Sequence, residues 1–414
     1  MPRLSRSDQQ ERNRARIVDA ARREFAEHGY REARIDAIAD RAELTRGAVY
    51  SNFPGKRALY FEVLAADADA AVPAPADASA DTSPGTSADT NSNTRPDARP
   101  DARPDARPDA RPGTNPGTNP GTIPGTSANT NPNTRPGTSA GTVRDALGNL
   151  AREWVARLPF TTRTDASLLG LELMAEVAAD QLTRLPFAQL KLLDAVVLGL
   201  AFEHLDSHRD DGGGRRSLVR LAQAALTLLH GTAQLAAAAP GFGDPFDTVR
   251  ACQALADLDL DQRNRRPIPL DGAPVHRPDP APKWWMPAAV DHLGTGPLAP
   301  HDGVVAILGM HRLAHVEDAL RAGHETTLAV VTGQPAELAP LARLSLAELR
   351  NHLRRAVPAK HWPALHVVVD DQGILARGAG LDTLSDTTET ALRVQDGRIV
   401  ARSDGWGACG SVAD

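Results

Sequence analysis

The segment 44–56 near the amino end concentrates hydrogen-bonding and cationic side chains. They are hydroxyls, a guanidinium, a phenol, an amide and an ammonium, contributed by Thr45, Arg46, Tyr50, Ser51, Asn52 and Lys56. A guanidinium can bind the edge of guanine, and the other groups can bind phosphates. Gly47 and Ala48 are small enough to let the backbone approach a partner closely. This combination indicates contact with double-stranded DNA.

The elements that must position these side chains are three helices. A helix is predicted over residues 8–27, with apolar residues at every fourth position and Gly29 as its stop. A second, short helix is predicted over residues 35–42. Thr45 can cap a third helix, which Pro54 ends. A helix this short is unstable alone, so its neighbours must present it. The order of helix, short helix, turn and short helix is the helix-turn-helix pattern.

The charge of the amino end has the sign expected of a DNA-contacting unit. Residues 1–57 carry 13 Arg or Lys and 9 Asp or Glu, whereas the whole chain has a formal net charge of −6. Positive charge attracts the phosphate backbone. The competing interpretation is that Tyr50 and Phe53 are core aromatics and that the arginines form a solvated face. Of these two aromatics, we expect Phe53 to be core.

These residues carry a resemblance to a known family. The run TRGAVYSNFPGK at 45–56, with Ile38-Ala39 before it and Leu59 after it, resembles the DNA-binding segment of TetR-type transcriptional regulators. The resemblance extends over about residues 14–64. It implies a homodimer that binds a palindromic DNA operator and releases it when a small-molecule inducer enters a helical domain.

The resemblance also implies roles for single residues. Arg46 and Ser51 would face the DNA groove, and the phosphate contacts would come from Thr45, Tyr50, Asn52 and Lys56. The chain departs from the family pattern at Ala33-Arg34, which replace the usual capping residues of the second helix, although Arg34 could add a phosphate contact. Glu43 stands at a turn position usually held by Gly, where a positive φ would cost some strain.

Composition divides the remainder of the chain. Residues 1–71 are predicted to form the DNA-binding domain. Residues 72–143 contain four Arg-Pro-Asp-Ala repeats and Gly-Thr-Asn-Pro units, which predicts a disordered insertion. This insertion is either a passive loop with its ends close together or a segment that loosens coupling between domains. A helical ligand-binding and dimerisation domain is predicted over 144–260, a linker over 261–282, and a final α/β domain over 283–414.

Apolar periodicity predicts five helices in the middle domain. They span residues 143–158, 164–184, 187–206, 216–239 and 245–258. The third and fourth are apolar on two sides, so one side would pack in the domain and the other against a second copy in a four-helix interface. The TetR resemblance implies a ligand cavity among the first three helices, with Trp154, Met174 and Phe202 as candidate lining residues.

The C-terminal region changes to short β-branched runs. Strands are predicted over 304–308, 327–331 and 365–369, alternating with helices over 311–322 and 345–357, and a hairpin follows with its turn at Asp396-Gly397. This order resembles the thioredoxin-like fold of peroxiredoxins over roughly residues 287–406. The predicted fold class is therefore multidomain: an all-α TetR-type helix-turn-helix and helical regulatory domain, followed by an α/β thioredoxin-like domain.

Thiol chemistry does not follow from this second resemblance. A reactive cysteine would stand after the first main strand, where the sequence has Gly309-Met310-His311-Arg312. Cys252 and Cys409 are far apart in sequence, so no disulfide framework is predicted. Cys409 is either a redox sensor or an inert free thiol. We expect no catalytic residue and no enzyme activity.

Metal, membrane and export signals are also weak. His311 and His315 have a four-residue spacing that can present two metal ligands, but the HExxH pattern is absent. We therefore predict no metal site and no cofactor. The sequence has no signal-peptide pattern and no run of 18 apolar residues, which predicts a cytoplasmic protein without membrane contact.

Two functions from different classes remain. The leading hypothesis is a ligand-responsive, homodimeric DNA-binding repressor. The rival is a redox or thioredoxin-like sensor or enzyme module in which DNA binding is accessory. An intact recognition segment beside an α/β region that lacks its nucleophile favours the first.

Overall fold

The computed structural model describes residues 6–70, 141–158, 170–206, 217–258, 260 and 272–413, all of which belong to one compact unit. The insertion predicted over 72–143 lies almost entirely outside the described residues and stays a prediction. Half of the linker predicted over 261–282 also lies outside them, while its described half includes the short strand Val275–His276, which pairs with the sheet of the C-terminal region.

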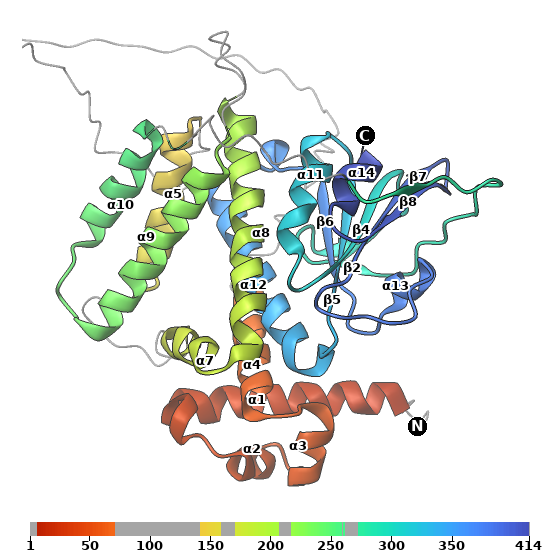
Figure 1. Cartoon of the computed structure of the whole chain (residues 1–414). Helices are drawn as coiled ribbons and strands as arrows, with labels where there is room; N and C mark the ends of the chain where they lie inside the picture. Colours follow the sequence, from red (N-terminus) through yellow and green to blue (C-terminus); the bar gives the residue numbers. More distant parts are fainter. Residues whose placement is uncertain are drawn as a thin grey trace, which may run out of the picture. The chain divides into compact units, whose positions relative to one another are not determined.

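The amino end folds as the predicted helix-turn-helix. Its helices are α1 (Arg6–Glu32), α2 (Ile35–Arg41), α3 (Arg46–Asn52) and α4 (Lys56–Ala70) (Figure 1). The chain bends at Gly29, whose φ of 72° lies in the left-handed region, and a last helical turn follows the bend. Gly29 therefore interrupts α1 where the sequence predicted its end.

The helical middle contains α5 (Val143–Val155), the 3₁₀ helix η1 (Gly170–Glu172), α7 (Leu173–Ala179), α8 (Gln181–Asp206), α9 (Val219–Ala238), α10 (Pro245–Ala254) and the 3₁₀ helix η2 (Leu255–Asp257). The single helix predicted over 164–184 is wrong in its described part, because Asp180 is extended and starts α8 by accepting a hydrogen bond from Leu182 N at 2.8 Å. A Cβ on Gly199 would lie 2.5 Å from the Cα of Val219, so glycine is what lets α8 meet the start of α9.

The C-terminal region is built on a six-stranded mixed sheet of order β1-β8-β7-β4-β5-β6. The strands are β1 (Val275–His276), β4 (Gly303–Gly309), β5 (Thr326–Val331), β6 (Leu365–Val369), β7 (Glu389–Gln395) and β8 (Arg398–Asp404), and β2 (Val290–Asp291) pairs with β3 (Gly296–Pro297) separately. Strands β4, β5 and β6 are parallel, and β7 is antiparallel to β4 and β8. Asp396 and Gly397 have φ of 50° and 66°, as a two-residue hairpin turn requires, so the predicted hairpin is confirmed.

Helices cover the sheet. They are α11 (Val316–Arg321), α12 (Pro335–Ala356), α13 (Ile374–Gly378) and α14 (Ala408–Ala413), with 3₁₀ helices η3 (Leu313–His315) and η4 (Ala359–His361). The helix predicted over 345–357 begins earlier, at Pro335. Pro335 suits the first helical turn, and Pro340 lies inside the helix.

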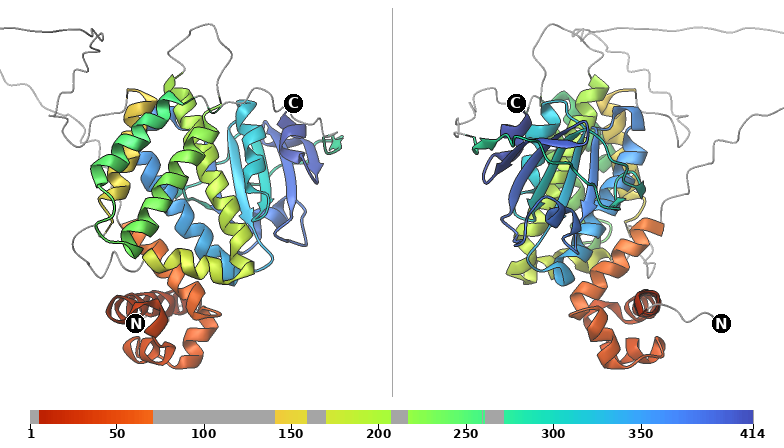
Figure 2. Two further views of the ribbon diagram at one scale, coloured as in Figure 1. Left: turned by 60° about the vertical axis from the view of Figure 1, so that its left-hand side comes forward. Right: turned by 90° about the vertical axis from the view of Figure 1, so that its right-hand side faces the viewer.

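One hydrophobic core joins the helical half to one face of the sheet. It contains Phe25 and Leu59 from the amino end, Leu193 from α8, and Leu328 and Val367 from the sheet. The opposite face of the sheet packs with α13 and Trp284 in a second core. Helix α12 contacts α4, α5 and α8, and Figure 2 shows it lying behind α8 among the helices. A helix that covers the sheet is therefore also part of the helical half.

The predicted dimer face on residues 187–206 is wrong. Both apolar stripes of α8 are buried within the chain, including Leu190, Leu193 and Val197 on one side and Leu198 and Phe202 on the other. The C-terminal region supplies part of the cover, since η3, α12 and η4 contact α8. By length and composition α8 is also the one helix among the described residues that could span a bilayer, but most of it is buried inside the protein.

Candidate nucleic-acid interface

Helix α3 is fixed at its start by a cap and along one side by the core. Thr45 Oγ1 accepts a hydrogen bond from Ala48 N at 3.2 Å, which confirms the predicted cap. Glu43 has a φ of 51°, so a non-glycine residue does occupy the left-handed turn position. Val49 and Phe53 are buried, and Phe53 is therefore a core residue as expected.

The opposite side of α3 is open to solvent. Arg46 and Tyr50 are both exposed, Tyr50 by 42%, so the interpretation of Tyr50 as a core aromatic is wrong. The guanidinium of Arg46 lies 5.6 Å from the centre of the Tyr50 ring and 3.2 Å from a carboxylate oxygen of Asp36 on α2. Gly47 is exposed beside them, and Ala48 is partly exposed. The arginine is thus held over the outer face of α3 by weak, exposed contacts that a stronger partner can replace.

The two polar residues at the end of α3 are turned back on the helix. Ser51 Oγ donates to the carbonyl of Ala48 at 2.9 Å, and Asn52 Nδ2 donates to the same carbonyl at 2.8 Å. Ser51 is exposed and Asn52 partly exposed. Their oxygen atoms can still accept hydrogen bonds, and Ser51 can exchange its intrahelical bond for an external one.

Lys56 and Arg34 lie at helix starts. The ammonium of Lys56 donates to the carbonyls of Arg31 at 3.0 Å and Ala33 at 3.2 Å, and it sits 4.7 Å from the centre of the Tyr30 ring. Lys56 therefore ties α4 to the end of α1, a role that the sequence did not reveal. Arg34 is exposed at the start of α2 and makes no side-chain cap, which confirms the predicted loss of that cap.

Arg14 on α1, which the sequence did not single out, contacts the end of α3. The guanidinium of Arg14 on α1 lies 4.3 Å from the centre of the Phe53 ring and donates to the carbonyl of Asn52 at 3.2 Å. Its other nitrogen lies 2.9 Å from Glu62 on α4. Arg14 thus joins α1, the end of α3 and α4.

Helix α4 is held in turn by α12, along nearly the whole length of α4. The close pairs are Arg57 with Glu337 at 3.5 Å, Glu62 with Arg343 at 3.3 Å, and Asp69 with Arg350 at 2.6 Å. Asn351 Nδ2 also donates to the carbonyl of Ala68 at 2.8 Å. Residue numbers rise together on both helices, so α4 and α12 run parallel. We call this row of contacts the α4–α12 seam. It connects the sheet region to the helix that follows the recognition helix.

The predicted ligand-lining residues lie in different surroundings. Phe202 is fully buried in α8, and Met174 is partly buried against the core in α7. The ring of Trp154 on α5 stacks on His352 of α12 at 4.9 Å and meets the edge of His230 of α9 at 4.8 Å. The ring partners of Trp154 are thus histidines, one of them from the C-terminal region.

A lysine and its two carboxylate partners lie near these rings. Lys191 Nζ lies 2.7 Å from Asp194 Oδ2 and 3.4 Å from Glu348 Oε2. Burial raises the pKa of Asp194 to about 6, which leaves the carboxylate ionised at neutral pH. Burial and the charge of Lys191 lower the pKa of His230 to about 3, and the same causes hold the pKa of His352 well below its usual range. Among the described residues no group pairs with Nε2 of His230 or Nδ1 of His352. Buried polar atoms of this kind call for a partner.

The cysteines and the predicted histidine pair are in surroundings that oppose the chemistry considered for them. Cys409 is fully buried, and burial raises the pKa of its thiol, while burial raises the pKa of Cys252 to about 12. A reactive thiolate needs the opposite shift. His311 and His315 do not share a helix, since η3 begins at Leu313, and His315 Nδ1 lies 2.8 Å from Glu389 Oε2.

The amino end matches known proteins by sequence. Residues 17–63 match the family described as bacterial regulatory proteins, tetR family. The chain is 36% identical over 69 residues to the HTH-type transcriptional repressor Rv1474c of Mycobacterium tuberculosis, which is 17% of this chain and 36% of that protein. It is 46% identical over 56 residues, 14% of this chain and 26% of the relative, to the HTH-type transcriptional regulator SrpR of Pseudomonas putida. It is 47% identical over 53 residues to the uncharacterized HTH-type transcriptional regulator TtgW of Pseudomonas putida, 13% of this chain and 40% of the relative.

These matches cover less than half of each relative. They show that the amino end is a TetR-family helix-turn-helix domain and that its relatives are transcriptional regulators. The helical middle and the mixed sheet lie outside the matched family segment.

Proposed function

We propose that this protein is a TetR-type transcriptional regulator, a homodimeric repressor that binds a palindromic operator and releases it when a small-molecule inducer binds. The observation that carries the proposal is helix α3, which is capped by Thr45 and presents an exposed Arg46 and Tyr50 within a matched helix-turn-helix domain. In this proposal Arg46 and Ser51 read base edges in the major groove. Contacts with the phosphate backbone come from Arg34, Thr45, Tyr50, Asn52 and Lys56, with Gly47 and Ala48 at the closest approach.

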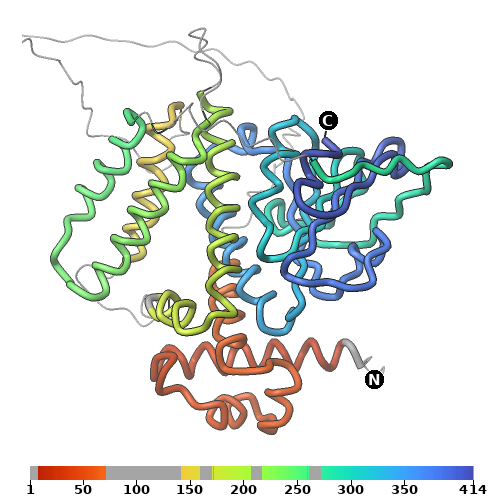
Figure 3. Tube along the Cα trace, viewed as in Figure 1, coloured from red at the N-terminus to blue at the C-terminus, as the bar shows by residue number. Residues whose placement is uncertain are grey.

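The homodimer in this proposal uses α9 and α10. Three exposed apolar side chains lie at and beside their connecting turn: Leu235 near the end of α9 at 49%, Phe242 in the turn at 75%, and Phe246 at the start of α10 at 72%. In Figure 3 this turn lies on the far side of the helices from the sheet. Exposed apolar residues that cluster in this way favour a protein interface. Pairing two copies there would present two recognition helices to one operator.

The inducer in this proposal acts on the group formed by Trp154, His230 and His352. Their rings and the unpaired histidine nitrogens suit a small molecule with an aromatic ring and hydrogen-bonding groups. His352 belongs to α12. A ligand that moves this helix therefore also changes the contacts of the α4–α12 seam. We propose that the mixed-sheet region, which we continue to interpret as thioredoxin-like and non-enzymatic, holds α4 through this seam. The proposed function implies a cytoplasmic protein.

Selection of bound fragments from random DNA tests the proposal. The wild-type protein should enrich a palindrome, and Arg46→Ala should lower affinity for it by about 10- to 100-fold and relax the preference at one base pair of each half-site. Arg144→Ala is the matched control, because Arg144 is an exposed arginine on α5, outside the proposed interface, and is paired with Asp257. It should leave binding unchanged. Recovery of no sequence above bulk competitor DNA would overturn the proposed function.

A further inference from the structure

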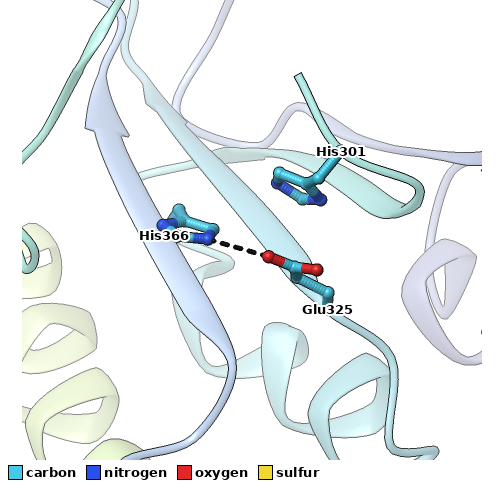
Figure 4. Close-up of side chains that lie close together, drawn as sticks. All are labelled: His301, Glu325 and His366. Carbon is cyan, nitrogen blue, oxygen red and sulfur yellow. Dashed lines mark hydrogen bonds and ion pairs between the residues drawn. The ribbon is translucent and has the colours of Figure 1, made fainter. Parts of the chain in front are cut away.

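Three metal-ligating side chains meet at one end of the sheet, away from the residues used above. His301 precedes β4, Glu325 precedes β5, and His366 lies in β6, at the starts of three adjacent parallel strands. One ligand atom from each lies within 4.8 Å of the other two. Figure 4 shows the imidazole of His366 directed at the carboxylate of Glu325, with the imidazole of His301 close to the same carboxylate. The group is open to solvent, since Glu325 is exposed and both histidines are partly exposed.

A buried carboxylate fixes the ring of His366. Its Nδ1 lies 2.9 Å from Asp291 Oδ2, and Asp291 is itself held by the backbone amides of Leu293 and Val367, each 3.0 Å from Oδ1. In the neutral form of the ring, an Nδ1 that donates to Asp291 leaves a lone pair on Nε2. That nitrogen faces Glu325 Oε1 at 3.2 Å. Two acceptors at this distance repel each other unless a cation or a proton lies between them.

The ring of His301, like that of His366, has its Nδ1 held by an acceptor. Its Nδ1 lies 3.0 Å from the carbonyl of Asp302, which can only accept a hydrogen bond, so Nδ1 carries the hydrogen and Nε2 the lone pair. Thr327 Oγ1 lies 2.7 Å from Nε2 and can donate to it. Thr327 is directly opposite His366 in the strand register. The Nε2 of His366 thus faces Glu325, whereas the Nε2 of His301 faces Thr327 and reaches a shared ion only after its ring rotates and gives up this hydrogen bond.

We propose that His301, Glu325 and His366 bind a divalent transition-metal ion of the zinc type, with Asp291 as the carboxylate that orients the ring of His366. Two imidazole nitrogens and a carboxylate oxygen are a ligand set that Zn²⁺ accepts, and a carboxylate behind a ligating histidine is its common support. Tetrahedral bonds of about 2.1 Å place ligand atoms roughly 3.4 Å apart, so small side-chain rotations bring the three groups into range. A water molecule takes the fourth position on the exposed side.

The other group of candidate ligands in the described residues has different partners. Glu24, Glu27 and His28 also come close together, but Arg41 binds both carboxylates, with its Nε 3.1 Å from Glu24 Oε2. A guanidinium already occupies that position. Glu325 is different. Among the described residues its ion-pair partner is His366, and no guanidinium or ammonium pairs with it.

Zinc titration of the untagged full-length protein, stripped of metal with a chelator, tests the site without any use of DNA. Competition with a chromophoric zinc indicator should show one zinc equivalent that His301→Ala and His366→Ala lose. His276→Ala is the matched control, because His276 is an exposed histidine on β1, and it should bind as the wild type does. Asp291→Asn should lower the affinity by about 10- to 100-fold.

Thermal melting provides a second readout. Zinc should raise the Tm of the wild type and of His276→Ala but not that of His301→Ala, because binding to the folded state stabilises it. His301 is partly exposed, so its replacement is compatible with folding. Equal zinc stoichiometry and equal affinity in the wild type and His301→Ala would overturn the site. That result would mean that a proton on His366, not a metal, bridges Asp291 and Glu325.

Discussion

The guanidinium of Arg350 donates to Asp69 Oδ1 at 2.6 Å and to the carbonyl of His292 at 3.0 Å, and so joins α4 to the segment that holds Asp291. Arg350 is almost fully buried, whereas Asp69 is more than half exposed. One side chain of the mixed-sheet region therefore fixes the end of the helix that leads away from the DNA-binding domain.

Asp69→Asn should destabilise the protein by about 1–2 kcal/mol. The change leaves the buried guanidinium of Arg350 without its carboxylate, and the exposure of Asp69 moderates the cost. Asp67→Asn is the matched control on the same helix, because its partner Arg22 is far more exposed than Arg350. It should cost less than 1 kcal/mol. Urea unfolding measures both. Equal losses for the two variants would show that the α4–α12 seam adds nothing beyond surface pairing.

Lys56→Ala should act on both folding and DNA binding. Without DNA, we expect a lower Tm, because the ammonium no longer ties the carbonyls of Arg31 and Ala33 to the start of α4. With DNA, affinity should fall equally for all sequences, and the salt dependence should become shallower by about one charge. Melting without DNA and titration at several salt concentrations separate the two effects. An unchanged Tm would contradict the structural part of this prediction.

Phe242→Asp should disrupt the proposed homodimer. A charged side chain in place of a central aromatic should raise the dimer dissociation constant by about 30-fold or more. Trp285→Ser is the control, because Trp285 is at least as exposed, at 84%, but lies in the C-terminal region. Sedimentation over a range of protein concentrations measures the mass. A stable dimer in the Phe242 variant would place the interface elsewhere.

The protein should become less stable as the pH falls from 7.5 to 5.5, partly through His230. Its pKa is about 3 when folded, and an unfolded histidine titrates near 6.5, so in this window the unfolded chain binds a proton that the folded chain excludes. This group alone should cost about 1 kcal/mol between the two pH values. Asp194 acts in the opposite direction, because its pKa is raised to about 6 and protonation favours the folded state.

A variant isolates the contribution of His230. His230→Phe keeps an aromatic ring against Trp154 and removes the titrating nitrogen. The stability difference between pH 7.5 and 5.5 should shrink in this variant by about 1 kcal/mol. Replacement of the exposed His276 should leave this stability difference unchanged. A variant with the pH dependence of the wild type would show that the folded and unfolded states bind a proton at His230 equally well.

Local patterns sufficed for the helix-turn-helix and for much of the secondary structure. The Thr45 cap, the Gly29 interruption and the hairpin turn at Asp396-Gly397 depend on a few neighbouring residues, so the sequence predicted them. The three parallel strands were visible as β-branched runs for the same reason. Burial, by contrast, depends on which elements meet. The second apolar stripe of α8 predicted packing against a second copy of the chain. The structure instead packs α8 against elements of the C-terminal region of the same chain.

The polar contacts show the same division. Arg350 and Asp69 are 281 residues apart, and each alone has the pattern of a solvated helix face. The sequence places three residues at or near the starts of predicted strands: His301, Glu325 and His366. Only the sheet order, with β5 between β4 and β6, brings them together. The sequence by itself determined the local elements and the chemistry of the recognition helix. The tertiary structure decided the seam and the candidate metal site, because contacts between distant residues depend on packing and not on local spacing.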